Sequence, residues 1–283
     1  MASRIPPLLD AYLHLPPETS LVLLSGVLGS STNWLVLRYL YSLLSTPSDN
    51  IPQEDGLGSP SKDGTSVVFV SFLRDYAFWK EGAGKLGIDL DVLARKGRFI
   101  FVDGLTGLFN SSFGHTSPGI PPGRKVLSST TLQQLYKELE DAVAQVQRSA
   151  PGQKTVFIAD QLDALLAASG DDISSQGLRE TLLDIREKVH SSIVTVSADE
   201  PLISPQATTL EKEHAAFTIS LAHDAHLVAS LRKLDTGTAR DVSGVLRVTP
   251  GGGDNGIDKA VEEQESLYYV TGDGGVRVFE RGQ

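Results

Sequence analysis

The sequence contains no cysteine, and its only methionine is the first residue. The lack of cysteine excludes disulfide bonds, cysteine-ligated metals and cysteine nucleophiles. Long apolar runs are also missing, because the longest one, 34–44, has eleven residues and includes Arg38. Such a run is too short to cross a bilayer. The first twenty residues contain four prolines and two acids, unlike a signal peptide. We therefore expect a cytoplasmic or nuclear protein with no membrane contact.

Basic residues are scarce relative to acidic ones, with 25 Lys and Arg against 35 Asp and Glu and a net charge of −10. Clustered Lys and Arg make the contacts to nucleic-acid phosphates, so this chain is a poor nucleic-acid binder on its own, although it could share a site with a basic partner. Hydrophobic residues make up 40% of the chain, which excludes wholesale disorder. Without an internal repeat or a second core, we predict a single domain over 1–283.

Short strand-like runs alternate with helical patterns over the first two thirds of the chain. The predicted strands are 21–25, 66–72, 98–102, 155–159 and 192–197, and the predicted helices lie at 31–45, between 73 and 94, and around 132–146 and 178–189. This alternation predicts a mostly parallel sheet covered on both faces. After about residue 225, strand-like runs separated by turn signals predict an antiparallel extension at one sheet edge.

Three segments, 46–65, 104–128 and 250–264, are predicted to be flexible insertions. The first two are rich in Gly, Pro and Ser, and just two aliphatic residues lie within the first. No strand or helix is predicted in any of the three.

The first predicted strand runs into a glycine turn, which contains Gly26, Gly29, Ser31, Thr32 and Asn33, and then into a helix. A phosphate loop has this context, because backbone amides and a helix N-terminus bind the phosphates there. That motif needs Gly, four residues, then Gly-Lys-Ser/Thr. Gly26 fits, but Ser31, Thr32 and Asn33 replace the second Gly, the Lys and the magnesium-binding hydroxyl. Without the lysine we expect a degenerate, non-catalytic loop. The alternative is a glycine turn with a serine cap.

The predicted strand 155–159 ends in Asp160, where the second nucleotide motif places a carboxylate that holds the metal or its water. By itself this pattern equally fits an aspartate that caps the next helix. Gln161 follows, so no carboxylate stands there as a base, and Asp163 is an unsupported candidate. Together the two motifs predict an α/β, RecA-like P-loop NTPase fold: a mostly parallel sheet flanked by helices, with an antiparallel C-terminal extension. We expect no catalytic residue, cofactor or metal.

Other motif matches fail on context. The stretch Gly82–Gly87 spells a dinucleotide fingerprint but lies in helical sequence rather than after a strand. Asp235-Thr-Gly resembles an aspartic-protease tripeptide but lies in a predicted hairpin turn and occurs once. His214, His223 and His226 have no cysteine and no carboxylate pattern beside them that would support a metal site.

Four segments resemble the Elongator subunit six family. They are LVLLSGVLGSSTNWLVLRYLYSLL at 21–44, VVFVSFLRDYAFWKEGAGKLGIDLDVLARKGRFIFVDGL at 67–105, TVFIADQLDALLA at 155–167 and TARDVSGVLRV at 238–248. The resemblance extends from about residue 20 to the C-terminus. The order of the strands and phrases such as KLGIDL and ARDVSGVLRV carry it, rather than a catalytic signature.

This resemblance implies a RecA-like fold without functional nucleotide motifs, hence a pseudo-ATPase. It also implies a hetero-hexameric ring with two copies each of Elongator subunits four, five and six. The ring docks on the catalytic Elongator subcomplex, which modifies the wobble uridine of tRNA towards its 5-methoxycarbonylmethyl and 5-carbamoylmethyl forms, and tRNA binds through the assembled ring. Subunit six is then a non-catalytic part of the ring.

In RecA-type rings, the loops after the fourth and fifth strands line the central hole, and here these are 169–176 and 198–210. Neither contains Lys or Arg, and the first contains Asp171 and Asp172. Since acids repel phosphate, we expect the partner subunits to supply most of the RNA affinity. The nearest basic candidates in this chain are Arg179, Lys212, Arg232, Lys233 and Arg240.

Two other functions fit the same fold. One is an active P-loop NTPase with an unusual loop, and the other is a recombinase-paralogue scaffold in DNA repair. A ring subunit differs from a monomeric enzyme in needing interfaces, so we expect exposed apolar side chains on two opposite sides of the chain.

Overall fold

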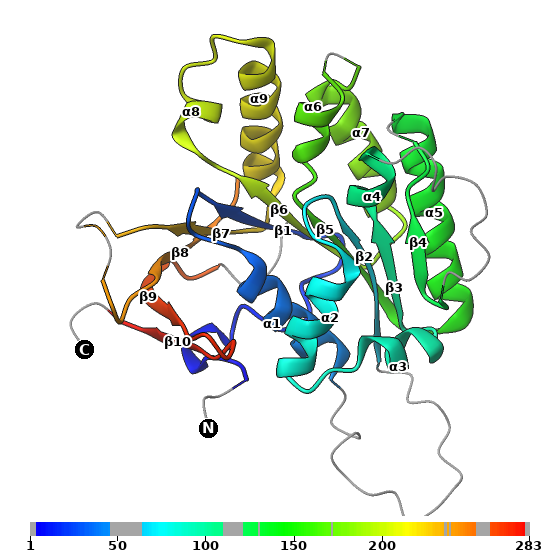
Figure 1. Ribbon diagram of the computed structural model, residues 1–283, viewed down its shortest axis with the longest axis horizontal. Helices are drawn as coiled ribbons and strands as arrows, with labels where there is room; N and C mark the ends of the chain where they lie inside the picture. Colours follow the sequence, from blue (N-terminus) through cyan, green and yellow to red (C-terminus); the bar gives the residue numbers. More distant parts are fainter. Residues whose placement is uncertain are drawn as a thin grey trace, which may run out of the picture.

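The computed structural model describes residues 4–45, 64–109, 121–129, 131–170, 172–234, 237, 239–252 and 261–280. Its strands are β1 (Leu21–Gly26), β2 (Thr65–Ser71), β3 (Phe99–Asp103), β4 (Arg124–Val126), β5 (Lys154–Asp160), β6 (Ser191–Ser197), β7 (Leu227–Arg232), β8 (Gly244–Pro250), β9 (Gln264–Val270) and β10 (Val276–Phe279). They form one ten-stranded sheet in the order β10-β9-β8-β7-β1-β6-β5-β2-β3-β4. Figure 1 shows this sheet with β1 near its centre.

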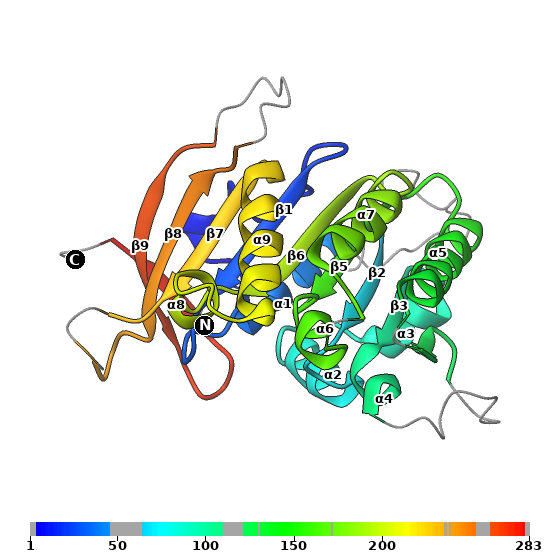
Figure 2. The ribbon, with the colours of Figure 1, turned by 90° about the horizontal axis from the view of Figure 1, so that it is seen from above.

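The helices cover the sheet on both faces, as predicted. They are η1 (Pro7–Leu9), α1 (Asn33–Leu44), α2 (Tyr76–Lys85), α3 (Leu90–Arg95), α4 (Gly104–Phe109), α5 (Leu132–Ser149), α6 (Ala164–Ala168), α7 (Ser175–Arg186), α8 (Glu200–Ile203) and α9 (Thr209–Asp224). The side chains of α1, α2 and α3 enter one core cluster, and those of α5, α6, α7 and α9 enter the other. Figure 2 shows α5, α7 and α9 side by side on their face.

The sheet is parallel from β7 through β1, β6, β5, β2 and β3 to β4, and antiparallel over β8, β9 and β10. This arrangement confirms the predicted α/β class with an antiparallel C-terminal extension. Val22 of β1 pairs with Ile193 of β6 on one side and Leu227 of β7 on the other. β1 therefore lies between β6 and β7, and the helix that follows β1 (α1) and the helix that precedes β7 (α9) cover opposite faces of the sheet. The carboxyl end of a strand at such a switch in connection is where open α/β sheets bind ligands.

The C-terminal extension starts one strand later than the sequence analysis places it. The run 227–231 was predicted to be antiparallel, but β7 is parallel to β1, so that part of the prediction is wrong. The reason is α9, which was not predicted and which supplies the crossover that a parallel connection needs. Its apolar positions are interrupted by buried His214 and Thr218, and this weakens the helical pattern in the sequence.

The structure describes only parts of the three predicted insertions. Within 104–128 the structure places helix α4 and strand β4, so the prediction of a loop without secondary structure is wrong there. The two elements are only six and three residues long, and β4 is a short strand at the sheet edge. The ends of the other two segments belong to strands, because Thr65 opens β2, Pro250 closes β8 and Gln264 opens β9. The stretches 46–63, 110–120 and 253–260 lie outside the described residues.

The antiparallel extension packs against α1. The rings of Trp34 in α1 and Tyr268 in β9 lie 5.1 Å apart. Further along the helix, Arg38 Nη2 donates a hydrogen bond to the Gly274 carbonyl in the β9–β10 turn at 2.8 Å. These contacts explain why α1 is apolar on nearly every side: the sheet covers one side of the helix and the extension covers another.

Candidate functional site

The loop between β1 and α1, Gly26–Asn33, is the candidate site, and we call it the degenerate phosphate loop. It needs glycine at two positions. Gly29 has a φ of +86°, in the left-handed region that other residues rarely adopt. At Gly26 the chain folds back so closely that a Cβ would lie 2.7 Å from the Ser30 carbonyl oxygen. The predicted strand, glycine turn and helix are therefore present in the structure.

The amides of this loop are largely engaged within the chain. Leu28 N donates to Asp199 Oδ1 at 2.7 Å, and Ser30 N donates to the Val27 carbonyl at 2.8 Å. At the start of α1, Asn33 N donates to Ser31 Oγ at 3.2 Å. In a working phosphate loop such amides point at the phosphates. Here the Asp199 carboxylate already accepts from one of them, and its negative charge would repel a phosphate at that position.

A lysine from the neighbouring strand lies over the same loop. Lys233 follows β7, and a Cβ placed on Gly29 would lie 2.2 Å from its Cε and 2.6 Å from its Nζ. Thr32, at the position of the motif's lysine, is 4% exposed. The cation beside this loop therefore comes from the residue after β7, and it lies against the backbone of Gly29.

Asp160 lies at the same carboxyl edge of the sheet, on β5, with β6 between it and β1. Its side chain is fully buried; Oδ2 accepts from Ser71 Oγ at 2.8 Å and Oδ1 accepts from Thr195 Oγ1 at 3.0 Å. Burial raises the pKa of Asp160, and the two hydroxyl donors oppose that rise. Both oxygens thus tie β2, β5 and β6 together, which favours a structural role for this aspartate.

Asp163 and His214 form a second buried polar cluster beside this edge. Asp163 Oδ2 accepts from the Ser197 amide at 3.1 Å and lies 3.8 Å from His214 Nδ1. His214 Nε2 lies 2.8 Å from the Ser197 carbonyl oxygen. Burial raises the pKa of Asp163 to about 6. Because both side chains are only about 5% exposed, this cluster joins α9 to the end of β6 and keeps Asp163 largely away from solvent.

Gln161, which directly follows Asp160, has a φ of +55°. Its backbone amide donates to Thr195 Oγ1 at 2.8 Å, and its Oε1 accepts from Ser197 Oγ at 2.8 Å. Those bonds hold an unfavourable backbone conformation in place next to the aspartate. The carboxyl edge of β5 and β6 is therefore a rigid network of side-chain hydrogen bonds.

The histidines considered for a metal site are spread out. His214 is buried beside Asp163, whereas His223 is exposed next to Asp224, 3.7 Å away. Among the described residues, no group of three or more His, Cys, Asp or Glu side chains could share a metal ion. Asp235 lies outside the described residues.

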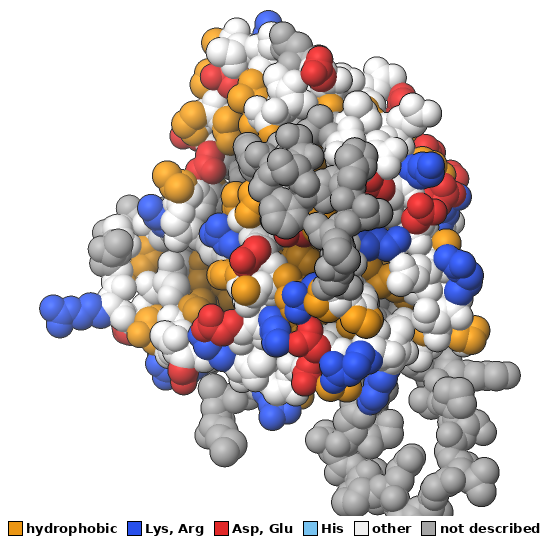
Figure 3. Space-filling model, turned by 45° about the vertical axis from the view of Figure 1, so that its right-hand side comes forward, with side chains coloured by type: hydrophobic (Ala, Val, Ile, Leu, Met, Phe, Trp, Pro, Cys, Tyr) orange, Lys and Arg blue, Asp and Glu red, His pale blue; other side chains and the backbone are white. Residues whose placement is uncertain are grey.

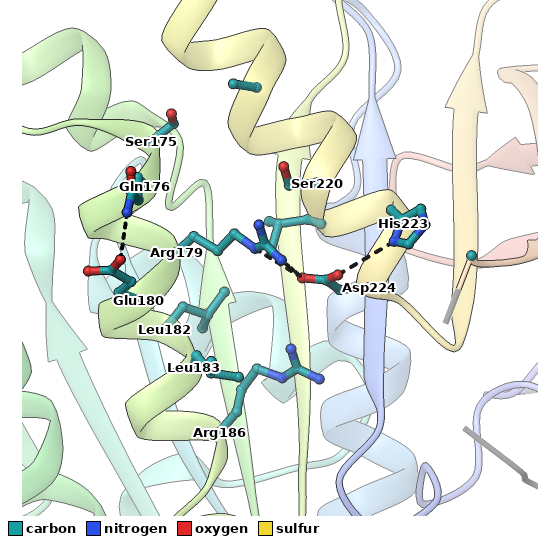
Figure 4. Close-up of a pocket in the computed structure, with 13 residues that line it drawn as sticks. Ser175, Gln176, Arg179, Glu180, Leu182, Leu183, Arg186, Ser220, His223 and Asp224 are labelled. Carbon is teal, nitrogen blue, oxygen red and sulfur yellow. Dashed lines mark hydrogen bonds and ion pairs between the residues drawn. The ribbon is translucent and has the colours of Figure 1, made fainter. Parts of the chain in front are cut away.

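The basic candidates for RNA contact are partly committed to acids. Arg179 in α7 and Asp224 in α9 form an ion pair at 2.9 Å across a groove of about 840 Å³. Figure 4 shows the two side chains pointing towards each other across this groove. Arg232 pairs with Glu265 at 3.4 Å. Lys212 and Arg240 are exposed. In the predicted hole-lining segments, α7 starts at Ser175 and α8 occupies Glu200–Ile203.

Exposed apolar side chains occur on both faces of the sheet. Leu28 in the degenerate phosphate loop is 81% exposed, and Leu73 and Phe78 lie at the end of β2 and in α2. On the opposite face, Leu183 in α7 and Ile219 in α9 are about half exposed, at 50% and 53%. Figure 3 shows hydrophobic side chains exposed between interspersed basic and acidic ones, with no single charge dominating that face.

Asp199 and the position of Lys233 were missed by the sequence analysis. Asp199 follows β6 by two residues, and Lys233 directly follows β7. Both strands pair with β1 in parallel, so their carboxyl ends meet the loop at one edge. A charged residue just after each neighbouring strand is the signal that could have identified them, once the strand order was known.

Sequence comparisons place the chain among known proteins. The family model described as "Elongation complex protein 6" matches residues 61–273. Elongator complex protein 6 of Xenopus laevis is 26% identical over 268 residues, covering 92% of this chain and 96% of that protein. The Schizosaccharomyces pombe homolog is 26% identical, covering 95% and 94%. The human Elongator complex protein 6 is 23% identical, covering 66% and 69%.

A comparison of structures supports the fold. A KaiC-like protein from the archaeon Pyrococcus horikoshii superimposes with a TM-score of 0.58 at 15% identity, covering 98% of this chain and 97% of that one. At this identity the likeness shows the fold alone, and the fold is the RecA-like one that the sequence predicts. Within the described residues, no helix has both the length and the apolar character needed to cross a membrane.

Proposed function

The chain belongs to the Elongation complex protein 6 family, and we propose that it acts as a non-catalytic subunit of a hetero-hexameric Elongator ring. In this proposal the ring contains two copies each of subunits four, five and six and docks on the catalytic Elongator subcomplex. The ring binds tRNA and supports modification of its wobble uridine to the 5-methoxycarbonylmethyl and 5-carbamoylmethyl forms. The family match over most of the chain is the observation that carries the proposal.

The chemistry of the degenerate phosphate loop supports the non-catalytic role. Thr32 replaces the lysine that stabilises the transferred phosphate, and Asp199 accepts from a loop amide. Asp160 is committed to two hydroxyl groups. We expect the purified chain to hydrolyse no ATP above the rate of the Asp160→Ala variant. Hydrolysis that depends on Gly26 and Asp160 would instead favour an active NTPase.

Affinity purification of the tagged full chain, followed by native mass measurement, tests the ring. We expect Elongator subunits four and five to co-purify in an assembly whose mass corresponds to two copies of each of the three. Co-purification of recombination proteins without Elongator subunits would favour the DNA-repair scaffold. A monomer without companions would contradict both.

A structural role in the ring implies that RNA affinity comes mainly from the partners. Arg179 and Arg232 are held by acids, and the segments 169–176 and 198–210 contain no basic residue. We expect charge reversal at Lys212 and Arg240 to leave the tRNA affinity of the assembled ring within about threefold. A loss of affinity on changing this subunit alone would refute this part of the proposal.

The proposal also includes the domain organisation, the location and the cofactor requirement of the chain. The chain forms a single domain over 1–283, works in the cytoplasm or nucleus, and needs no cofactor or metal. Limited proteolysis of the assembled ring tests the domain organisation: we expect one protected core, with cleavage confined to the three predicted insertions.

A further inference from the structure

The groove of about 840 Å³ between α7 and α9 lies on the face of the sheet opposite α1. Its α7 wall extends from Ser175 to Arg186, the whole length of that helix, and its α9 wall includes the small side chains of Ala216 and Ser220. At 1.5 Å per residue, the α7 wall is about 18 Å long, which matches about three turns of another helix. The groove therefore has the length and the shape that helix-in-groove recognition uses.

Aliphatic side chains are exposed along this groove. Leu183 lines it from α7 and is 50% exposed, and Ile219 on the outer side of α9 is 53% exposed. Leu182 and Leu221 in the lining are buried beneath them. Exposed aliphatic side chains above a groove with a buried apolar floor are the anchors that an amphipathic helix contacts.

Three acids lie beside Leu183 on the solvent-facing side of α7. Glu180, Asp184 and Glu187 are all exposed, and their spacing of four and three residues puts them on one side of the helix. Figure 4 shows Glu180 turned away from α9. Among the described residues, none of the three acids forms an ion pair. The rim of the groove on the α7 side is therefore negatively charged.

The basic side chains of the same region do not neutralise this rim, because they are committed to partners within the chain. Their contacts are those of Arg179 with Asp224 at 2.9 Å, Lys188 with Glu140 at 2.9 Å, and Arg186 Nη2 with the Thr19 carbonyl oxygen at 3.3 Å. A partner with positive charges opposite this rim is complementary to it, and charge complementarity of this kind sets the specificity of an interface.

We propose that this groove binds a basic amphipathic helix of another protein. The apolar side of that helix contacts Leu183 and fills the groove, and its Lys or Arg side chains lie against the three acids. A second copy of this chain would place the same acids against one another, and a nucleic acid would place phosphates there, so like charges disfavour both. The proposal does not rest on the ring, because it uses the surface of the single chain.

Fluorescence anisotropy with a labelled peptide and the full chain tests the chemistry of the partner. The probe is LKKLLKLLKKLLKL, which is basic and has leucines at helical spacing. Its controls are LKLKLKLKLKLKLL, with the same composition at strand spacing, and the acidic LEELLELLEELLEL. At about 0.15 M salt, where long-range attraction is screened, we expect the probe to bind at least about tenfold more tightly than either control. No binding of the probe, or equal binding of either control, overturns the proposal.

Two pairs of variants with matched changes locate the binding. Asp184→Lys and Asp10→Lys change the net charge equally, but Asp10 is an exposed acid next to η1, on another part of the chain. Leu183→Ser and Leu73→Ser each remove an exposed leucine, and Leu73 is 44% exposed after β2. We expect the two α7 variants to weaken probe binding at least about fivefold and the two controls to stay within about twofold. Equal losses within either pair overturn the proposal.

The stability and mass of the free chain complete the test. All four substituted side chains are exposed, so we expect unchanged urea midpoints. If Asp184→Lys does not fold, the two leucine variants decide. We also expect Leu183→Ser to leave the native mass of the free chain unchanged. A dimer that Leu183→Ser dissociates would assign the groove to a second copy and overturn the proposal, whereas failure of peptide binding leaves the co-purification test of the ring unaffected.

Discussion

The Asp199 carboxylate accepts a hydrogen bond from the Leu28 amide at 2.7 Å, although the two residues are 171 positions apart in the sequence. Leu28 lies in a loop whose backbone resembles a phosphate-binding turn, and Asp199 follows the neighbouring strand β6. A negative charge from the chain itself thus stands where a phosphate loop presents an amide to its ligand. The loop therefore departs from a working phosphate loop in two ways: it lacks the lysine, and one of its amides is already bound by a carboxylate of the chain.

Removing this carboxylate tests whether it stabilises the loop. We expect Asp199→Ala to lower the free energy of unfolding by about 1 kcal/mol, because one charge-assisted hydrogen bond at a partly exposed position is lost. Urea unfolding at neutral pH measures the change. Glu200→Ala, at the exposed next position, is the control and should stay within about 0.5 kcal/mol. Equal urea midpoints for Asp199→Ala and Glu200→Ala would show that Asp199 does not stabilise the loop.

We expect Asp160 to contribute to folding stability rather than to nucleotide binding. We expect Asp160→Ala to cost about 2–3 kcal/mol, because the Ser71 and Thr195 hydroxyls lose their buried acceptor. Asp160→Asn should cost less, since its amide oxygen can still accept one of the two. Asp172→Ala, in the exposed segment before α7, should be near neutral. Equal urea midpoints for Asp160→Ala and Asp172→Ala would show that Asp160 is not structural.

Asp163 makes the stability depend on pH. Burial raises its pKa to about 6 in the folded chain, from 3.8 for an ordinary aspartate. Between these values the folded state holds a proton that the unfolded state has lost, so the free energy of unfolding falls as pH rises from about 4 to 6. Asp163→Asn cannot titrate, so the difference between wild type and variant isolates this effect. Unfolding curves at several pH values measure it, and parallel pH profiles for the two proteins would contradict the raised pKa.

Leu28 is a candidate contact of the proposed ring. It is 81% exposed at the carboxyl edge of the sheet, the edge that faces the neighbouring subunit in RecA-type assemblies. We expect Leu28→Glu to reduce co-purification of the partner subunits severalfold and to leave the urea midpoint unchanged, because the side chain makes little contact within the chain. Lys96→Glu, an exposed charge reversal at the opposite edge of the sheet, should assemble normally. Normal assembly of Leu28→Glu would remove this residue from the interface.

The buried strands were readable from the sequence because fully covered parallel strands are continuous apolar runs. The run 66–72 is β2 almost to the residue, and every residue of β2 is buried. Hydrophobic patterning did not reveal α9, because its buried face includes the polar residues His214 and Thr218. It did not reveal β4 either, because three residues are too few to form a pattern. For the candidate site, the glycine turn and Asp160 were found because they stand at the carboxyl ends of apolar strands. Asp199 and Lys233 were not, because their importance depends on which strands lie beside β1.

The sequence by itself determined the α/β class, the two degenerate motifs and the family resemblance. Local order and residue type suffice for these, because hydrophobic periodicity and glycine turns act over a few neighbouring residues. Only the tertiary structure decided what those residues touch: Asp199 contacts the Leu28 amide, two hydroxyls contact Asp160, and Arg38 contacts the Gly274 carbonyl. These contacts join residues far apart in the sequence, and strand order and packing set them, so no local pattern encodes them.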